Sequence, residues 1–152
     1  MTVKREILFL KRDYWIIRDT IAAVREHRID ISFHFDSAPG AEQAVEVLCF
    51  GHASKVKEEA FVSHCYGQKE AAKALRFSAN LNGNGEIVTF LLPQQSGTQW
   101  DVTEIETNEG REFEVRAGNT RDTVIIPASG PWLWTRTSAG EVSESLCAAL
   151  TE

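Results

Sequence analysis

Two residues in the stretch "SHCYG" are of the types that move protons in enzymes. His64 and Tyr66 are two positions apart, so on a β-strand they share one face. One group of such a pair can remove a proton while the other protonates a leaving group, once their pKa values are tuned toward neutrality. The alternative is that Tyr66 packs beside Gly67 at a turn and that His64 lies on the surface. We favour the turn and keep His64 and Tyr66 as the catalytic candidates.

Cysteine and histidine side chains supply the candidate metal ligands. Zinc binds sulfur and imidazole, and the chain offers Cys49, His52, His64 and Cys65. Their spacing matches no common zinc motif, and the adjacent His64 and Cys65 would point to opposite faces of a strand. Cysteine is also among the residue types most often buried. The sequence therefore predicts plain thiols, with no metal and no other cofactor.

The stretch "PWLWTRT" contains the candidate carbohydrate-binding face. Trp132, Trp134 and Arg136 alternate along the chain, so a strand places them on one face. Sugars stack on flat aromatic rings, and an arginine binds a carboxylate or sulfate through two hydrogen bonds. The same stripe is typical of a core, because large aromatic side chains are usually buried. Exposure of the two rings would favour a sugar platform, and burial would favour a core.

The alternating stretch Arg28–Phe35 predicts a half-buried strand, and two further histidines, His27 just before it and His34 near its end, accompany it. His27 falls in register with its apolar face and His34 with its polar face, so the two imidazoles cannot bind one ion. If His34 is buried, Asp30 on the same face would fix its tautomer. His34 therefore joins the tryptophan strand as a candidate for carbohydrate binding.

Short β runs separated by turn residues dominate the chain. About ten strands at regular spacing, with little helix, predict an all-β fold, an antiparallel β-sandwich. Asn-Gly supplies the positive φ of a tight turn, so Asn82–Gly85 predicts a hairpin. Only Ser143–Leu150 is predicted to be helical. We find no internal repeat and no linker, so residues 1–152 are predicted to form a single domain.

Composition narrows the function classes. The net charge of −6 argues against a nucleic-acid or anionic-membrane surface, which needs clustered lysine and arginine. No apolar run is long enough to cross a bilayer, and the first residues lack the apolar core and cleavage site of a signal peptide. We expect no nucleic-acid and no membrane partner, and both a cytoplasmic and a periplasmic location stay open.

Several blocks of the chain follow the order of a known family. They are the basic-led strand Arg5–Leu10, the aromatic pair Tyr14–Trp15, then Asp19, and His27 with Phe33–His34–Phe35. Further on come "FVSHCYGQKEAAKALRFSA" and "IVTFLLP". In this combination, from Lys4 to Pro93, the chain resembles the C-terminal β-sandwich region of the heparinase II/III-like polysaccharide lyases.

The resemblance implies a part in the cleavage of acidic polysaccharide by β-elimination. Such lyases join an α-helical toroid to sandwich layers, and their acid/base groups lie mostly in the toroid and the early sandwich. Neither the toroid nor the family's "HGHAD"-type and "R…HN" segments occur here. The chain is therefore expected to be a non-catalytic portion that packs on the toroid of a parent chain and lines the substrate cleft. An uncovered docking face would make the isolated domain sticky or dimeric.

Two other functions stay open from the sequence. A free-standing carbohydrate-binding module would use Trp132 and Trp134 as its platform. A purely structural assembly domain would associate through its unpaired edge strands. Saturable binding of a glycan would argue against the assembly domain.

Overall fold

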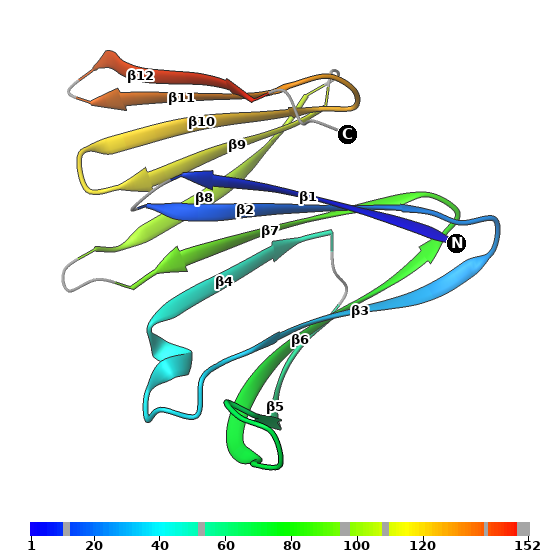
Figure 1. Cartoon of the computed structure of the whole chain (residues 1–152). Coiled ribbons are helices and arrows are strands. Elements are labelled where there is room, and N and C mark those ends of the chain that lie inside the picture. Colours follow the sequence, from blue (N-terminus) through cyan, green and yellow to red (C-terminus); the bar gives the residue numbers. More distant parts are fainter. Residues whose placement is uncertain (11–12, 52–53, 95–97, 108–109, 139, 149–152) are drawn as a thin grey trace. The chain divides into compact units, whose positions relative to one another are not determined.

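The computed structural model describes residues 1–10, 13–51, 54–94, 98–107, 110–138 and 140–148. Twelve strands are found in these residues, arranged in two compact units, Met1–Gln94 (unit 1) and Gln95–Glu152 (unit 2) (Figure 1). The predicted all-β, antiparallel sandwich class is confirmed. That residues 1–152 form a single domain stays a prediction. No helix in the described ranges is long and apolar enough to span a membrane.

Unit 1 is an antiparallel sandwich of two sheets. Its elements are β1 (Thr2–Leu10), β2 (Tyr14–Ala22), β3 (Glu26–His34), the short 3-10 helix η1 (Ala41–Gln43), β4 (Val45–Phe50), β5 (Ser54–Val62), β6 (Glu70–Asn82) and β7 (Gly85–Pro93). The four-stranded sheet has the order β1-β2-β7-β4, and the three-stranded sheet has the order β3-β6-β5.

Two pairs of consecutive strands turn together from one sheet to the other. β2 pairs with β7 in the four-stranded sheet, and their continuations β3 and β6 pair in the three-stranded sheet. Asn82–Gly85 therefore reverses the chain between sheets, and the tight hairpin predicted there is wrong. Gly83 has a φ of 93°, which glycine adopts without steric cost. The turn residues are correctly located, but the strands that they join do not pair with each other.

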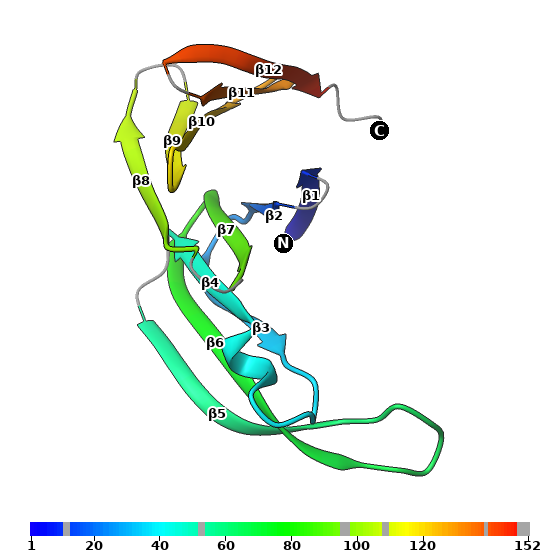
Figure 2. The same ribbon diagram turned by 90° about the vertical axis from the view of Figure 1, so that its left-hand side faces the viewer.

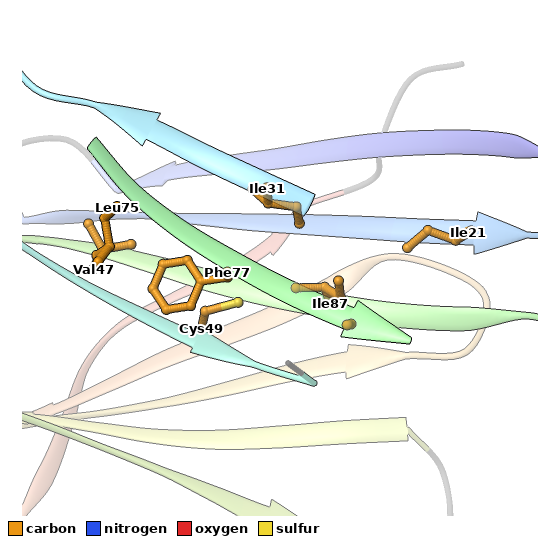
Figure 3. Packing of buried hydrophobic residues seen from close by; sticks show 8 residues of the cluster. Ile21, Ile31, Val47, Cys49, Leu75, Phe77 and Ile87 are labelled. Carbon is orange, nitrogen blue, oxygen red and sulfur yellow. The ribbon is translucent and has the colours of Figure 1, made fainter. Parts of the chain in front are cut away.

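The core of unit 1 lies between its two sheets. Figure 3 shows Phe77 of β6 among side chains of both sheets, and its ring centroid lies 6.2 Å from that of Phe33 in an edge-to-face arrangement. Most of the buried residues alternate along their strands, because residues two apart on a strand face the same side. The buried cluster consists of Ile21, Ile31, Val47, Cys49, Leu75, Phe77, Ala79 and Ile87.

Unit 2 is a five-stranded antiparallel meander with the order β12-β11-β10-β9-β8. Its strands are β8 (Trp100–Glu106), β9 (Gly110–Ala117), β10 (Thr120–Pro127), β11 (Trp132–Ser138) and β12 (Glu141–Ala148). The helix predicted at Ser143–Leu150 is wrong, because its described part belongs to β12. Pairing with β11, which places Leu146 opposite Trp134, overrides the local helix tendency of this stretch.

Candidate functional site

The loop between β5 and β6 carries both catalytic candidates. β5 ends at Val62 and β6 begins at Glu70, so His64 and Tyr66 are not on a strand. Tyr66 is fully exposed, and the side chain of His64 is 52% exposed. Burial is one of the means by which enzymes tune a catalytic acid or base, and this loop does not provide it. The turn that the sequence favours at Tyr66 and Gly67 is present.

His64 contacts the loop that follows β3. Its Nε2 lies 3.4 Å from Oγ of Ser37 and 3.8 Å from Oδ1 of Asp36. The Ser37 hydroxyl donates a hydrogen bond of 2.6 Å to Glu70. A Ser–His–Asp relay needs the hydroxyl and the carboxylate on different ring nitrogens, whereas here both contact the same one. The cluster therefore links two loops of unit 1 and does not activate a nucleophile.

The candidate metal ligands are spread over different parts of unit 1. Cys49 is buried in the core, where it packs in the cluster of Phe77, and Cys65 is exposed in the β5–β6 loop. Seven residues of β6 separate Phe77 from that loop, which corresponds to roughly 23 Å. Cys49 therefore cannot share an ion with His64 or Cys65. His52 lies outside the described residues, which contain no cluster of three metal-ligating side chains.

The tryptophan stripe lies on one face of β11, as alternation predicts. Trp132 and Trp134 are only 1% and 5% exposed, which favours the core over the sugar platform. The Trp134 indole donates a hydrogen bond of 3.2 Å to Asp122 of β10. Arg136 donates two more to the same carboxylate, at 2.8 and 2.7 Å. The guanidinium that could bind a sugar carboxylate is thus already engaged by a carboxylate of the protein.

His34 lies exposed at the end of β3 and does not share a hydrogen bond with Asp30. Asp30 instead accepts hydrogen bonds from Ser78 of β6 and from Arg28, the latter at 3.1 Å. The bond from Ser78 holds the pKa of the Asp30 carboxyl below its ordinary value of 3.8, and Arg28 acts in the same direction. This pair belongs to unit 1, whereas the tryptophan stripe belongs to unit 2.

Replacing Ser78 by alanine is expected to raise the pKa of Asp30 toward 3.8, because it removes the largest stabilising contact of the carboxylate. A carboxyl whose folded pKa is lowered contributes stability above its unfolded pKa and loses it as pH falls through the folded value. Ser78→Ala should therefore flatten the loss of stability below pH 3.8. NMR titration of the Asp30 carboxyl carbon measures the shift. Ser32→Ala, at an exposed serine on the same strand, is the control that should leave the titration unchanged.

A groove of about 490 Å³ opens in unit 1 beside the edge strands β4 and β5. This volume lies within the range of small-molecule sites in proteins. Its lining is apolar at Phe35, Val45 and Leu75 and basic at Lys55 and Lys57. We call it the lysine groove. It combines an apolar surface with a few charged groups, which is the usual composition of a binding site.

Several acidic side chains of the lysine groove are already neutralised. Glu59 forms an ion pair with Lys73 across the β5–β6 ladder. Glu58 forms another with Arg76, at 3.1 Å. These carboxylates therefore contribute little net negative charge to the groove.

Lys55 and Lys57 differ from the other charged residues of the lysine groove. They lie opposite Phe77 and Leu75 in the β5–β6 register, so they point toward the core side of the sheet. No ion pair joins either amine to a described residue, and the Lys55 amine lies 5.6 Å from the ring centroid of Phe77. Glu42 of η1 and Glu46 of β4 add two carboxylates to the lining, and the Gln94 amide donates a hydrogen bond of 3.1 Å to Glu46. The groove can thus offer two cationic groups to an anionic ligand.

Inward-pointing charges on an edge strand also have a purely structural use, because they prevent sheets from joining edge to edge. Lys55 and Lys57 satisfy that description as well as they satisfy a binding role. The sequence analysis did not single them out, although their spacing of two residues places both on one face of a strand. What it could not show is that η1 and Gln94 close the groove around them.

The sequence blocks from which the lyase resemblance is inferred all lie in unit 1, which ends one residue after Pro93. The strand with Phe33 and His34 pairs directly with the strand "KALRFSA" of the later block. Comparisons of the chain with models of protein families, with curated proteins and with solved structures find no match.

Proposed function

We propose that this chain is the non-catalytic β-sandwich portion of a heparinase II/III-like lyase and that its lysine groove holds acidic polysaccharide. The observation that carries the proposal is the pair of lysine amines, Lys55 and Lys57, that line the groove and form no ion pair with a carboxylate of the described residues. Residues two apart on a strand are separated by roughly 7 Å. Two cations at that distance suit a chain of sugars that carries repeated carboxylates or sulfates.

The resemblance from Lys4 to Pro93 supports the same proposal, because it coincides with the unit that contains the groove. Elimination requires a base that removes the proton α to the uronate carboxyl and an acid that protonates the leaving oxygen. In this proposal the toroid of the parent chain supplies both groups. The contribution of this chain is to bind and orient the acidic sugars along one wall of the cleft.

Burial of Trp132 and Trp134 makes the groove a better candidate than the tryptophan strand. A free-standing binding module needs exposed rings on which sugars can stack, and these two rings are covered. Binding in the lysine groove should weaken as salt is added, because ions screen exposed charges.

The variant Lys55→Ala/Lys57→Ala is expected to bind oligouronate roughly tenfold more weakly than the parent protein, which corresponds to about 1.4 kcal/mol. Each lost amine removes one contact with a carboxylate of the ligand. Isothermal titration calorimetry with a defined oligouronate at low salt measures the change. The matched control is Lys4→Ala/Lys69→Ala, which removes the same charge outside the groove and should leave the affinity unchanged.

Equal affinity of both double variants would contradict the proposed function and leave edge protection as the role of the two lysines. The absence of any oligouronate binding by the parent protein would contradict it as well. The chain alone should produce no unsaturated uronate, which ultraviolet absorbance detects. Turnover by the isolated chain would show that the catalytic groups lie here and not in a toroid.

A further inference from the structure

The two sheets of unit 1 differ by one strand, and the difference falls at β1. Because β2 and β7 continue as β3 and β6, β3 lies across the core from β2, and β6 lies across from β7. β1 extends the four-stranded sheet beyond β2, on the side where the three-stranded sheet already ends at β3 (Figure 2). Among the described strands of unit 1, none lies beyond β3 to cover β1.

Exposure changes abruptly at this position. On the core-facing side of β2, Ile17 and Ile21 are 7% and 0% exposed. Their direct neighbours on β1, Ile7 and Val3, are 53% and 51% exposed. Phe9 continues this row and stacks on Trp15 at a centroid distance of 4.8 Å. The core-facing row of β1 is therefore apolar and uncovered.

The edge of the three-stranded sheet at β3 is equally open. β3 is nine residues long and pairs only with β6 in the described part of the chain, without a break in register. Its core-facing residues Ile29, Ile31 and Phe33 are apolar. The opposite edge, β5, carries Lys55 and Lys57 on its core-facing side. Inward-pointing charges are one means of protecting a free edge, and of the two edges of this sheet only β5 carries lysines on its core-facing side.

A second copy of the chain does not fit beside β3. A two-fold axis perpendicular to the sheet at this edge would place the β3 of the second copy antiparallel to β3. The β2 of that copy, which lies across the core from its own β3, would then occupy the position of β1. The two four-stranded sheets would collide. The site therefore has room for one strand and not for another sandwich.

We propose that the edge of β3 accepts one extended segment of the parent polypeptide, which becomes the fourth strand of the three-stranded sheet. The segment hydrogen-bonds to β3 and lays its core-facing side chains over Val3, Ile7 and Phe9. Its origin in the parent polypeptide rests on the proposed function, whereas the strand site itself rests on β1 and β3 alone.

The neighbours of the site define the chemistry of this segment. Its core-facing positions must be apolar and spaced by two, to match Val3, Ile7 and Phe9. Between Val3 and Ile7, Arg5 is already paired with Asp19 at 2.7 Å and does not demand a counter-charge. On the outer face, Arg28 and Asp30 already form an ion pair with each other at 3.1 Å, so polar side chains of the segment suffice beside them. The occupant is thus an alternating strand of about nine residues.

A peptide probe tests the strand site. It is a nine-residue, end-blocked peptide with isoleucine at every second position and threonine, one glutamate and one lysine between. NMR hydrogen exchange should show slower exchange of β3 amides at 1:1 peptide, with no change at β5. Ile7→Glu, at an exposed position that tolerates a charge, should weaken binding at least tenfold. Val56→Glu is the matched control, because Val56 is an exposed apolar residue on the other edge strand.

Three results would each overturn the site: slower exchange at β5 instead of β3, equal peptide binding by Ile7→Glu and the control, or a dimer that pairs through β3.

The origin of the segment is tested in the native polypeptide with photoreactive p-benzoylphenylalanine in place of Phe9. A cross-link within the same polypeptide supports the proposal, and a cross-link to another protein overturns the parent origin. Loss of oligouronate binding in Lys55→Ala/Lys57→Ala with unchanged peptide binding would confirm that the two sites are separate. If the parent protein binds the peptide but no oligouronate, the proposed function is contradicted and the strand site is not.

Discussion

Replacing Phe77 by alanine is expected to destabilise unit 1 by about 3–5 kcal/mol, the usual cost of deleting a buried phenylalanine. Phe77 is among the largest fully covered side chains of the molecule and lies between the two sheets. Its removal takes away the contact with Phe33 and leaves a cavity that both sheets border. Chemical denaturation followed by circular dichroism measures the loss of unfolding free energy.

Phe61→Ala is the matched control for this experiment. Phe61 lies on β5 of the same sheet but is more than half exposed, with the Lys69 amine 4.0 Å from its ring centroid. Its replacement should cost less than about 1 kcal/mol, because little apolar area returns to water. Equal losses in the two variants would contradict the core assigned to unit 1.

Alternation predicted the strands where one face is apolar. In Arg28–Phe35 the apolar residues share a parity, and the structure places them on the core face of β3. The same rule gives no signal at the start of β5, because Lys55 and Lys57 occupy core-facing positions. A strand with charges on its inner face has no apolar alternation to detect.

The face of a strand on which a residue lies follows from its position in the local sequence, whereas burial of that face does not. The sequence placed Trp132, Trp134 and Arg136 on one face, but whether that face is covered depends on residues distant in the chain. The hairpin predicted at Asn82–Gly85 shows the same limit. Asn-Gly chemistry locates a reversal, while the sheet that each strand joins is decided by β2 and β3.

The lysine groove could not be predicted from the sequence for a related reason. It needs β4 and β5 at the same side of a two-layered sandwich, and it needs Gln94 beside η1. None of these residues is unusual by itself. The resemblance to the lyases suggested an acidic polysaccharide as ligand but did not point to Lys55 and Lys57 as its partners.

Replacing Asp122 by asparagine is expected to destabilise unit 2 by about 3–5 kcal/mol, because it leaves a partly buried guanidinium without its counter-charge. Asp122 is 2% exposed and accepts hydrogen bonds from the Trp134 indole and, at both of its oxygens, from Arg136. Asparagine has the same shape but no charge, so packing is preserved and the electrostatic loss dominates. Denaturation followed by tryptophan fluorescence measures it.

Two comparisons separate the lost charge from other effects of the Asp122→Asn substitution. Asp101→Asn, at an exposed position on β8 of the same sheet, should change stability by no more than about 0.5 kcal/mol. The double variant Asp122→Leu/Arg136→Met removes both charges, and replacing a whole buried pair by apolar residues is often close to neutral. It should therefore be more stable than Asp122→Asn, since no unpaired charge remains. A double variant less stable than Asp122→Asn would contradict this expectation. The attraction between Asp122 and Arg136 would then stabilise unit 2 by more than the cost of burying Arg136 without Asp122.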